Sequence, residues 1–138
     1  MPLPFFVYGT LRAGETNATL LHGAIARSRL AKLSGAQMFD LGPYPMIVES
    51  EGEVWGELVE IEADKYATIV KSLDRLEGVD GNNPANPDAL YRRLRRDVTV
   101  EDETIEAWVY FGRETVARRG RLIAGGDWLE RFGKVQRS

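Results

Sequence analysis

The sequence predicts an α+β fold with a mainly antiparallel, barrel-like sheet. Two observations predict this class. Short apolar segments rich in β-branched and aromatic residues recur along the chain, separated by glycine, proline or acidic turns. One segment in the middle of the chain has clear helical periodicity, and weaker helical signals lie towards each end. The chain has 138 residues, which is the size of a single compact domain, so we predict one domain over residues 1–138.

The predicted strands follow one another with few interruptions. The first, over residues 5–8, is apolar at every position, which predicts burial on both faces, and Gly9 ends it in a turn. Further strands are predicted over residues 36–41, 46–48, 54–61, 91–100 and 105–111. The clearest loop, over residues 80–88, contains two prolines and three asparagines. An acidic turn over residues 101–104 joins the last two strands.

Two helices are predicted from spacing. A short one would contain Leu20, Leu21 and Ile25, with Asn17 as its N-cap. The strongest covers residues 63–76, where the apolar side chains share one helical face. These side chains are Tyr66, Ile69, Val70, Leu73 and Leu76.

Glu77 has an unusual place relative to this helix. It lies four residues after Leu73 and seven after Val70, so a helix that reaches it would point its carboxylate into the buried face, with Asp74 and Arg75 pointing away. Burial and the negative end of the helix dipole would both raise its pKa. A raised pKa is what a general acid–base at neutral pH requires. Alternatively, the helix ends at Leu76 and Glu77 turns to solvent.

Composition excludes several kinds of site. The chain has no cysteine and one histidine, which excludes disulfides, thiolate chemistry and multi-histidine zinc sites, and we predict neither a metal nor a cofactor. The net charge of −3 argues against a dedicated nucleic-acid binder. The arginine run over residues 92–96 is interpreted as a solvated edge strand. No apolar run of about 18 residues and no signal-peptide pattern occur, so we predict a cytoplasmic protein without membrane association.

The turn after the first strand is the second candidate site. Gly9 allows backbone N–H groups to approach a ligand closely, and successive N–H groups can hold a carboxylate or an oxyanion. A plain turn is the alternative interpretation.

The segments together resemble the gamma-glutamylcyclotransferase-like family, which includes plant AIG2-like proteins and small bacterial homologues. The matching motifs cover nearly the whole chain. In chain order they are VYGTL at residues 7–11, GAxxxDLGPYPxIV at 35–48, LDxLEG at 73–78, the pair Tyr91-Arg92, WVY at 108–110 and GDW at 126–128.

This resemblance implies a small mixed β-barrel flanked by helices, with a pocket at one end. The family's catalytic glutamate corresponds to Glu77, and its substrate-holding loop to Tyr8, Gly9, Thr10 and Leu11. Tyr44 and Tyr110 correspond to pocket-wall positions, and we expect Tyr110 to orient Glu77. The implied reaction, of the acyltransferase or cyclising lyase type, closes a small γ-glutamyl amide to 5-oxoproline and releases an amine or amino acid.

Two other functions compete with this enzyme. The first is a non-catalytic module whose pocket holds a small carboxylate ligand, with Glu77 as a hydrogen-bonding partner. The second is a barrel that binds single-stranded nucleic acid, which the acidic net charge disfavours. The partner expected for the enzyme is a small-molecule γ-glutamyl substrate, and the sequence leads to no prediction of the leaving amine or of the oligomeric state.

Overall fold

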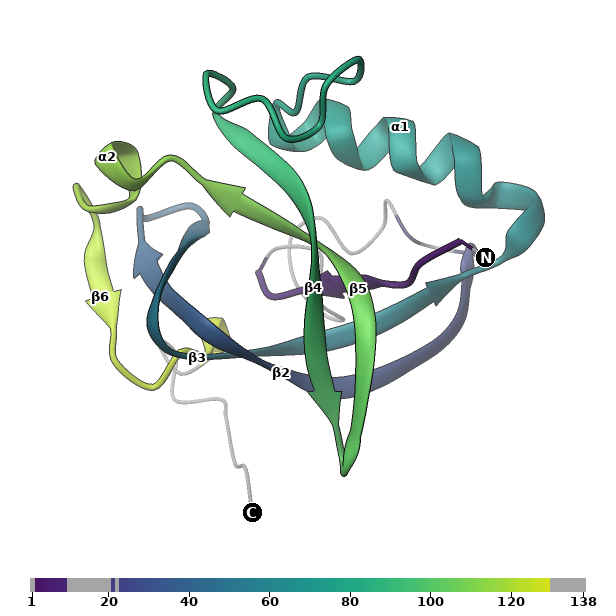
Figure 1. Ribbon diagram of the computed structural model, residues 1–138, viewed down its shortest axis with the longest axis horizontal. Helices are drawn as coiled ribbons and strands as arrows, with labels where there is room; N and C mark the ends of the chain where they lie inside the picture. The colour runs from purple at the N-terminus through teal and green to yellow at the C-terminus, as the bar shows by residue number, and fades with distance from the viewer. Residues whose placement is uncertain (1, 10–20, 22, 130–138) are drawn as a thin grey trace.

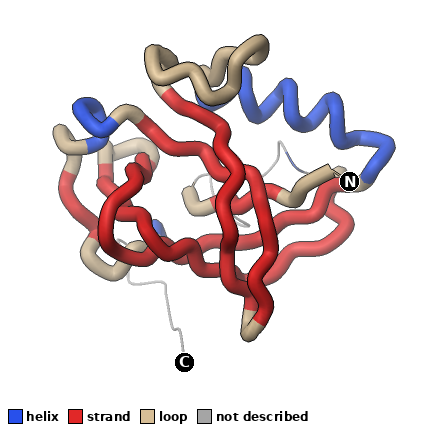
Figure 2. Tube along the Cα trace, in the orientation of Figure 1, coloured by secondary structure: helices blue, strands red, loops and turns tan. Residues whose placement is uncertain are grey.

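The structure is a computed structural model that describes residues 2–9, 21 and 23–129. Strands make up most of it, and the helices lie at its periphery (Figures 1 and 2). In chain order the elements are β1 (Phe5–Val7), β2 (Ile25–Asp40), β3 (Pro45–Ile61), the 3₁₀ helix η2 (Ala63–Lys65), α1 (Tyr66–Glu77), β4 (Tyr91–Val100), β5 (Glu103–Gly112), α2 (Glu114–Ala117) and β6 (Arg121–Ile123). The predicted α+β class is confirmed.

The strands form one six-stranded sheet in the order β3-β1-β5-β4-β2-β6, with a further pairing between β2 and β3. The first five strands therefore pair around a ring. All pairings are antiparallel except that of β1 with β5. The β1–β5 and β4–β2 links each consist of a single residue pair, Phe5 with Trp108 and Lys32 with Thr99. Closure into a barrel therefore stays a prediction.

β2 and β3 are both longer than their sequence predicts. β2 begins at Ile25, so the predicted short helix is wrong at that residue. Asn17 and Leu20, which were predicted in the same helix, lie outside the described residues. The first six residues of β2 are exposed or half-buried, so they carry no apolar alternation to mark a strand. β3 contains both strands predicted over residues 46–48 and 54–61. The polar residues 49–53 between them, which have the composition of a loop, lie at a register shift opposite Gly35.

Two apolar clusters lie on opposite faces of β1. Phe6 and Tyr8 point into one cluster, which also contains the fully buried Trp128. Phe5 and Val7 point into the other, which lies under α1. The predicted burial of this strand on both faces is confirmed. β1 therefore lies in the core, and Gly9 follows two residues after its end.

Helix α1 lies beside β1 and β5 and ends at Glu77 (Figure 1). Gly78 follows in the left-handed conformation, and the N–H of Val79 donates to the carbonyl of Asp74 at 2.8 Å. The alternative in which the helix stops at Leu76 is therefore wrong. Two details of the predicted helical face are also wrong: Asp74 is buried, and Leu76 is exposed.

The other elements agree with the sequence more closely. β4 has the predicted bounds, and the loop before it is confirmed. The predicted acidic turn is shorter than expected, because Glu103 and Thr104 already pair within β5. In the part of the chain that the structure describes, no helix is both long and apolar enough for a membrane span.

We predict that Gly56→Ala lowers the free energy of unfolding by about 2 kcal/mol. A Cβ at residue 56 would overlap the carbonyl oxygen of Val7 and lie 2.9 Å from the Phe6 ring, so β1 would have to shift. Gly81→Ala is the matched control, because a Cβ at that loop position meets no atom within 4 Å. Urea unfolding of both variants checks the prediction, and equal stabilities would contradict it.

Candidate functional site

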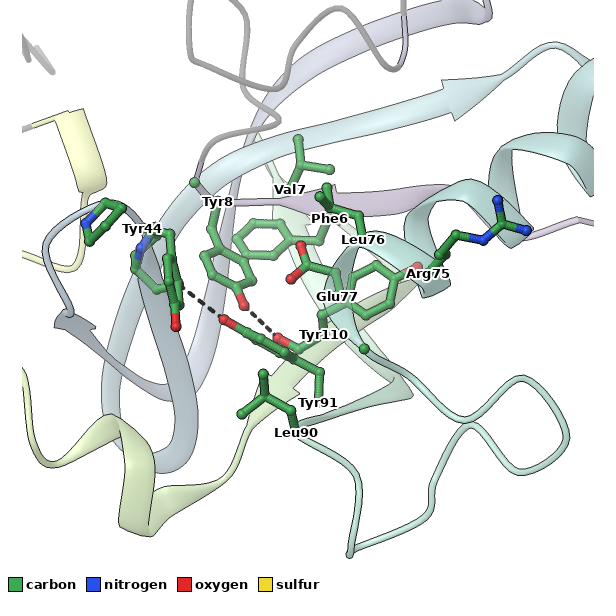
Figure 3. A pocket seen from close by; sticks show the side chains of 14 residues that line it. Phe6, Val7, Tyr8, Tyr44, Arg75, Leu76, Glu77, Leu90, Tyr91 and Tyr110 are labelled. Atoms are coloured by element: carbon green, nitrogen blue, oxygen red, sulfur yellow. Dashed lines mark hydrogen bonds between the residues drawn. The ribbon is translucent and has the colours of Figure 1, made fainter.

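A pocket of about 440 Å³ lies between the end of α1, the end of β1 and the start of β4 (Figure 3). Its wall is mostly aromatic and aliphatic. The lining residues are Phe6, Val7, Tyr8, Gly9, Pro43, Tyr44, Pro45, Arg75, Leu76, Glu77, Gly78, Leu90, Tyr91 and Tyr110. A cavity of this size and character is typical of a small-molecule site.

Most of the predicted site residues meet in this pocket. Tyr8, Gly9 and Glu77 line it together with Tyr44 and Tyr110, although they come from four separate segments of the chain. Two predicted residues, Thr10 and Leu11, lie outside the described residues.

Glu77 is half-buried and its carboxylate points into the pocket (Figure 3). α1 carries the side chain there because the helix continues through residue 77, one turn after the buried Leu73. Burial removes water from the carboxylate and raises its pKa from an ordinary value of 4.5 to about 7. Within the described part of the chain, no side chain donates a hydrogen bond to this carboxylate. Glu77 can therefore both accept and donate a proton near neutral pH.

Three tyrosines surround Glu77 and remain neutral. The Tyr8 hydroxyl donates to the carbonyl of Tyr110 at 2.7 Å, and the Tyr91 hydroxyl donates to the carbonyl of Pro45 at 3.3 Å (Figure 3). Burial raises the pKa of Tyr8, Tyr91 and Tyr110, each by more than any charged neighbour does. Because the Tyr8 and Tyr91 protons are already donated to carbonyls, these hydroxyls present acceptor lone pairs to the pocket.

At Gly9 the backbone lies close to the ring of Pro45. A Cβ at this residue would lie 2.5 Å from Cγ of Pro45, so a side chain has no room there. Pro45 also lines the pocket and begins β3. The expectation that the backbone N–H groups from Gly9 onward hold an anion stays a prediction.

The structure corrects the predicted role of Tyr110. Its hydroxyl donates to Oδ1 of Asp74 at 2.8 Å, so it does not orient Glu77 through a hydrogen bond. Asp74 in turn accepts two hydrogen bonds from Arg93, at 2.9 and 3.2 Å. The Arg93 guanidinium also lies 4.3 Å from the centre of the Trp108 ring. This cluster of four residues, the Asp74 cluster, anchors the last turn of α1 to β4 and β5.

The Asp74 cluster also corrects the interpretation of the arginine run. Arg93 is not a solvated edge residue, since its side chain is 10% exposed against 37% for Arg96, which pairs with Glu49 on the surface. The spacing of apolar residues in α1 does not predict this cluster. Asp74 lies about a quarter-turn from the centre of the apolar face, and its partner Arg93 is 19 residues away in the sequence.

Sequence reasoning also missed Tyr91, Leu76 and Leu90 as pocket residues. Tyr91 had a signal, because it belongs to the Tyr-Arg motif that opens β4. The spacing of Leu76 predicted that it is buried in the core, and so argued against a place in the pocket wall. Leu90 had none, because it lies at the end of an irregular loop.

Comparison with known proteins relates the chain to one family. A family model described as gamma-glutamyl cyclotransferase, AIG2-like, matches residues 5–130. A protein of Vibrio cholerae serotype O1, provisionally named a gamma-glutamylcyclotransferase, is 36% identical over 126 residues, which are 91% of this chain and 95% of that protein. The gamma-L-glutamyl-butirosin B gamma-glutamyl cyclotransferase of Niallia circulans is 31% identical over 105 residues, which are 76% of this chain and 64% of that protein.

A solved structure has the same fold. The crystal structure of YkqA from Bacillus subtilis is similar with a TM-score of 0.68 and 28% sequence identity. The similarity covers 94% of this chain and 40% of YkqA, so the chain spans less than half the length of that protein.

We predict that Arg93→Met destabilises the protein by about 3 kcal/mol, because it leaves the Asp74 carboxylate buried without its cation. Adding Asp74→Asn to Arg93→Met should recover part of that loss, since the amide carries no charge. Arg96→Met is the control and should cost less than about 1 kcal/mol, because its pair with Glu49 is exposed. Urea unfolding measures all three variants, and similar losses for Arg93→Met and Arg96→Met would contradict the prediction.

We predict a pH-dependent gain in stability for Glu77→Gln. The pKa is 4.5 for an ordinary glutamate and about 7 for Glu77 in the folded protein. At a pH between these two pKa values, Glu77 is protonated in the folded state and ionised in the unfolded state. Wild-type stability therefore falls as pH rises through this window, whereas glutamine removes that dependence. The stability of Glu77→Gln relative to wild type should rise between about pH 5 and about pH 8. A difference that stays constant with pH, by urea unfolding, would disprove the raised pKa.

Proposed function

The chain belongs to the gamma-glutamyl cyclotransferase, AIG2-like family, and we propose that it converts a small γ-glutamyl amide into 5-oxoproline and a free amine or amino acid. The observation that carries this proposal is Glu77, an acid–base group with a pKa of about 7 that points into an apolar pocket. The Niallia circulans relative, whose name assigns it a γ-glutamyl substrate, supports the same substrate class.

The proposed reaction is intramolecular. The Glu77 carboxylate takes a proton from the α-ammonium group of the γ-glutamyl unit, and the freed amine attacks the γ-carbonyl carbon of the same unit. A new carbon–nitrogen bond closes the five-membered ring. The protonated Glu77 then returns this proton to the amide nitrogen as its bond to carbon breaks. The regenerated carboxylate takes the second proton, which the ring nitrogen loses as it becomes the lactam N–H, and passes it to the released amine, which departs as an ammonium ion.

Two physical effects account for the rate in this proposal. The pocket holds the substrate folded so that its amine lies against its own carbonyl, and such positioning is worth about 7–11 kcal/mol where alignment is good. Proton transfer by Glu77 contributes about 10²–10⁴-fold. The neutral hydroxyls of Tyr8 and Tyr91 present acceptor lone pairs that suit the substrate's ammonium group.

We predict that Glu77→Gln lowers kcat by about 10²–10⁴-fold, because the amide can neither take nor return a proton. Wild-type kcat/KM should rise with pH through about 7, where Glu77 ionises. Mass spectrometry of released 5-oxoproline from a panel of γ-glutamyl amino acids and γ-glutamyl amines measures both effects.

The matched control is Glu106→Gln on β5, whose side chain is exposed. It should retain wild-type activity. Undiminished turnover by Glu77→Gln would disprove the acid–base role. Binding of the panel without any turnover by the wild type would instead indicate the non-catalytic binding module.

A further inference from the structure

Few side chains hold the last turn of α1, the turn that carries Glu77. The structure describes every residue of this helix, and only Leu73 and Asp74 are buried. Leu76, the next residue whose spacing would bring it to the apolar face, is 43% exposed. Apolar packing therefore fixes the helix as far as Leu73, and the side chain of Asp74 makes the next attachment to the sheet.

Asp74 is attached to two strands at once. Arg93 of β4 donates two hydrogen bonds to its carboxylate, at 2.9 and 3.2 Å, and the Tyr110 hydroxyl of β5 donates a third at 2.8 Å. The side chains of Arg93 and Asp74 are only 10% and 9% exposed, so water and salt screen the pair little. A bidentate arginine–carboxylate pair also has a narrow geometry. The position of Asp74 relative to both strands is therefore fixed.

Arg93 connects the same turn with two further segments. Its backbone N–H donates to the carbonyl of Pro84 at 2.9 Å, which holds the loop between α1 and β4. Its guanidinium lies over Trp108, 4.3 Å from the ring centre. The Trp108 indole N–H donates in turn to the hydroxyl of Tyr66, the first residue of α1, at 3.1 Å. Both ends of the helix are thus attached to β5, through Trp108 at its start and through Tyr110 at its end.

Tyr110 is the common reference point for the helix end and for Tyr8. Its hydroxyl donates to Asp74, and its backbone carbonyl accepts the hydrogen bond of the Tyr8 hydroxyl at 2.7 Å. Glu77 lies three residues after Asp74, in the same turn of α1. The Glu77 carboxylate and the Tyr8 hydroxyl face the same pocket (Figure 3), and their relative position therefore depends on the attachment of Asp74.

We propose that Asp74 and Arg93 are positioning residues that hold the Glu77 carboxylate in place relative to Tyr8 for proton transfer. This inference rests on the proposed acid–base role of Glu77. Neither Asp74 nor Arg93 is among the described residues that line the pocket, so neither needs to contact the substrate. Both act through the place that they give to the last turn of α1. Ring closure within one substrate is sensitive to such placement, since a misplacement of about 1 Å can cost about 10²-fold in rate.

The environment of Glu77 provides a measurement that a purely stabilising role would leave unchanged. Burial raises its pKa to about 7, so a last turn that moves away from the sheet and admits water should let the pKa fall towards 4.5. Removal of a cation at unchanged geometry has the opposite sign, because it makes a nearby carboxylate harder to ionise. The substitution Arg93→Met therefore separates loss of position from loss of charge by the direction in which the pKa moves.

The other titratable groups around Glu77 are the same in this variant. Among the described residues of the pocket wall they are Tyr8, Tyr44, Tyr91, Tyr110 and Arg75. Arg75 extends away from the cavity (Figure 3). A lowered pKa of Glu77 in Arg93→Met would therefore report a change in burial.

The variant Arg93→Met tests the proposal, with Arg96→Met as the matched control whose ion pair with Glu49 is exposed. NMR titration of isotope-labelled glutamate carboxyl groups measures the pKa of Glu77, whose signal is identified by its absence from Glu77→Gln. We expect Arg93→Met to lower this pKa from about 7 to about 6 or below. It should also lower kcat by about 10–10²-fold, with a smaller change in KM. Arg96→Met should leave the pKa of Glu77 and kcat unchanged.

A second variant removes the pair with a smaller loss of stability. Asp74→Asn combined with Arg93→Met leaves neither partner of the pair buried as an uncompensated charge. It also removes one charge of each sign, so the net charge near Glu77 does not change. We expect stability, measured by urea unfolding, to recover in part relative to Arg93→Met, whereas the pKa of Glu77 and kcat should stay low.

The outcomes distinguish the positioning role from the proposed reaction. A Glu77 pKa that stays at about 7 or rises in the folded variants would overturn the positioning role, as would a kcat that recovers together with stability. The cyclisation would still be supported by turnover of the wild type. If the wild type releases no 5-oxoproline from any γ-glutamyl amide, the cyclisation fails. The direction of the pKa change then decides alone whether Asp74 and Arg93 position Glu77.

Discussion

The ion pair between Asp74 and Arg93 holds the end of α1 against the sheet, and the geometry of the pocket depends on that attachment. Arg93 donates two hydrogen bonds to Asp74, and Tyr110 donates a third. A buried carboxylate requires such partners, since its charge is otherwise costly inside the protein. The pair lies one turn before Glu77 and therefore determines where the last turn of the helix, and with it the Glu77 carboxylate, can lie.

The last turn of α1 carries two carboxylates with opposite environments, the buried Asp74 and the half-buried Glu77. Asp74 is surrounded by donors and serves the structure. Glu77, three residues later, receives no hydrogen bond from the described side chains and faces tyrosines and leucines. Desolvation without compensation is what raises the pKa of Glu77 to about 7. The last turn of α1 thus carries Asp74, which anchors the helix to the sheet, and Glu77, whose environment suits proton transfer.

The proposed chemistry needs few groups because the substrate supplies its own nucleophile. A reaction that closes a ring requires a folded substrate and one proton carrier, and both requirements are met by a rigid apolar cavity with one titratable carboxyl. Hydrogen bonds hold three tyrosine hydroxyls of the wall: Tyr8 donates to the Tyr110 carbonyl, Tyr91 to the Pro45 carbonyl and Tyr110 to Asp74. The exposed side chains of Tyr44, Leu76 and Leu90 also line the pocket.

The sequence alone determined the features that follow from local spacing. The uninterrupted apolar run of β1, the strand β4 and the apolar face of α1 could all be predicted, because burial on a strand or helix repeats with a fixed period. Spacing also predicted that a helix reaching Glu77 would point it towards that face, but left open whether the helix extends so far. The tertiary structure decided what depends on distant partners. Asp74 is buried only because Arg93 and Tyr110 reach it from β4 and β5, 19 and 36 residues away. Leu76 is exposed although its spacing places it on the apolar face of the helix. The exposed half of β2 is a strand because β3 pairs with it. The periodicity of the sequence does not predict these contacts, because each one joins two residues that are far apart in the sequence and meet only in the folded chain.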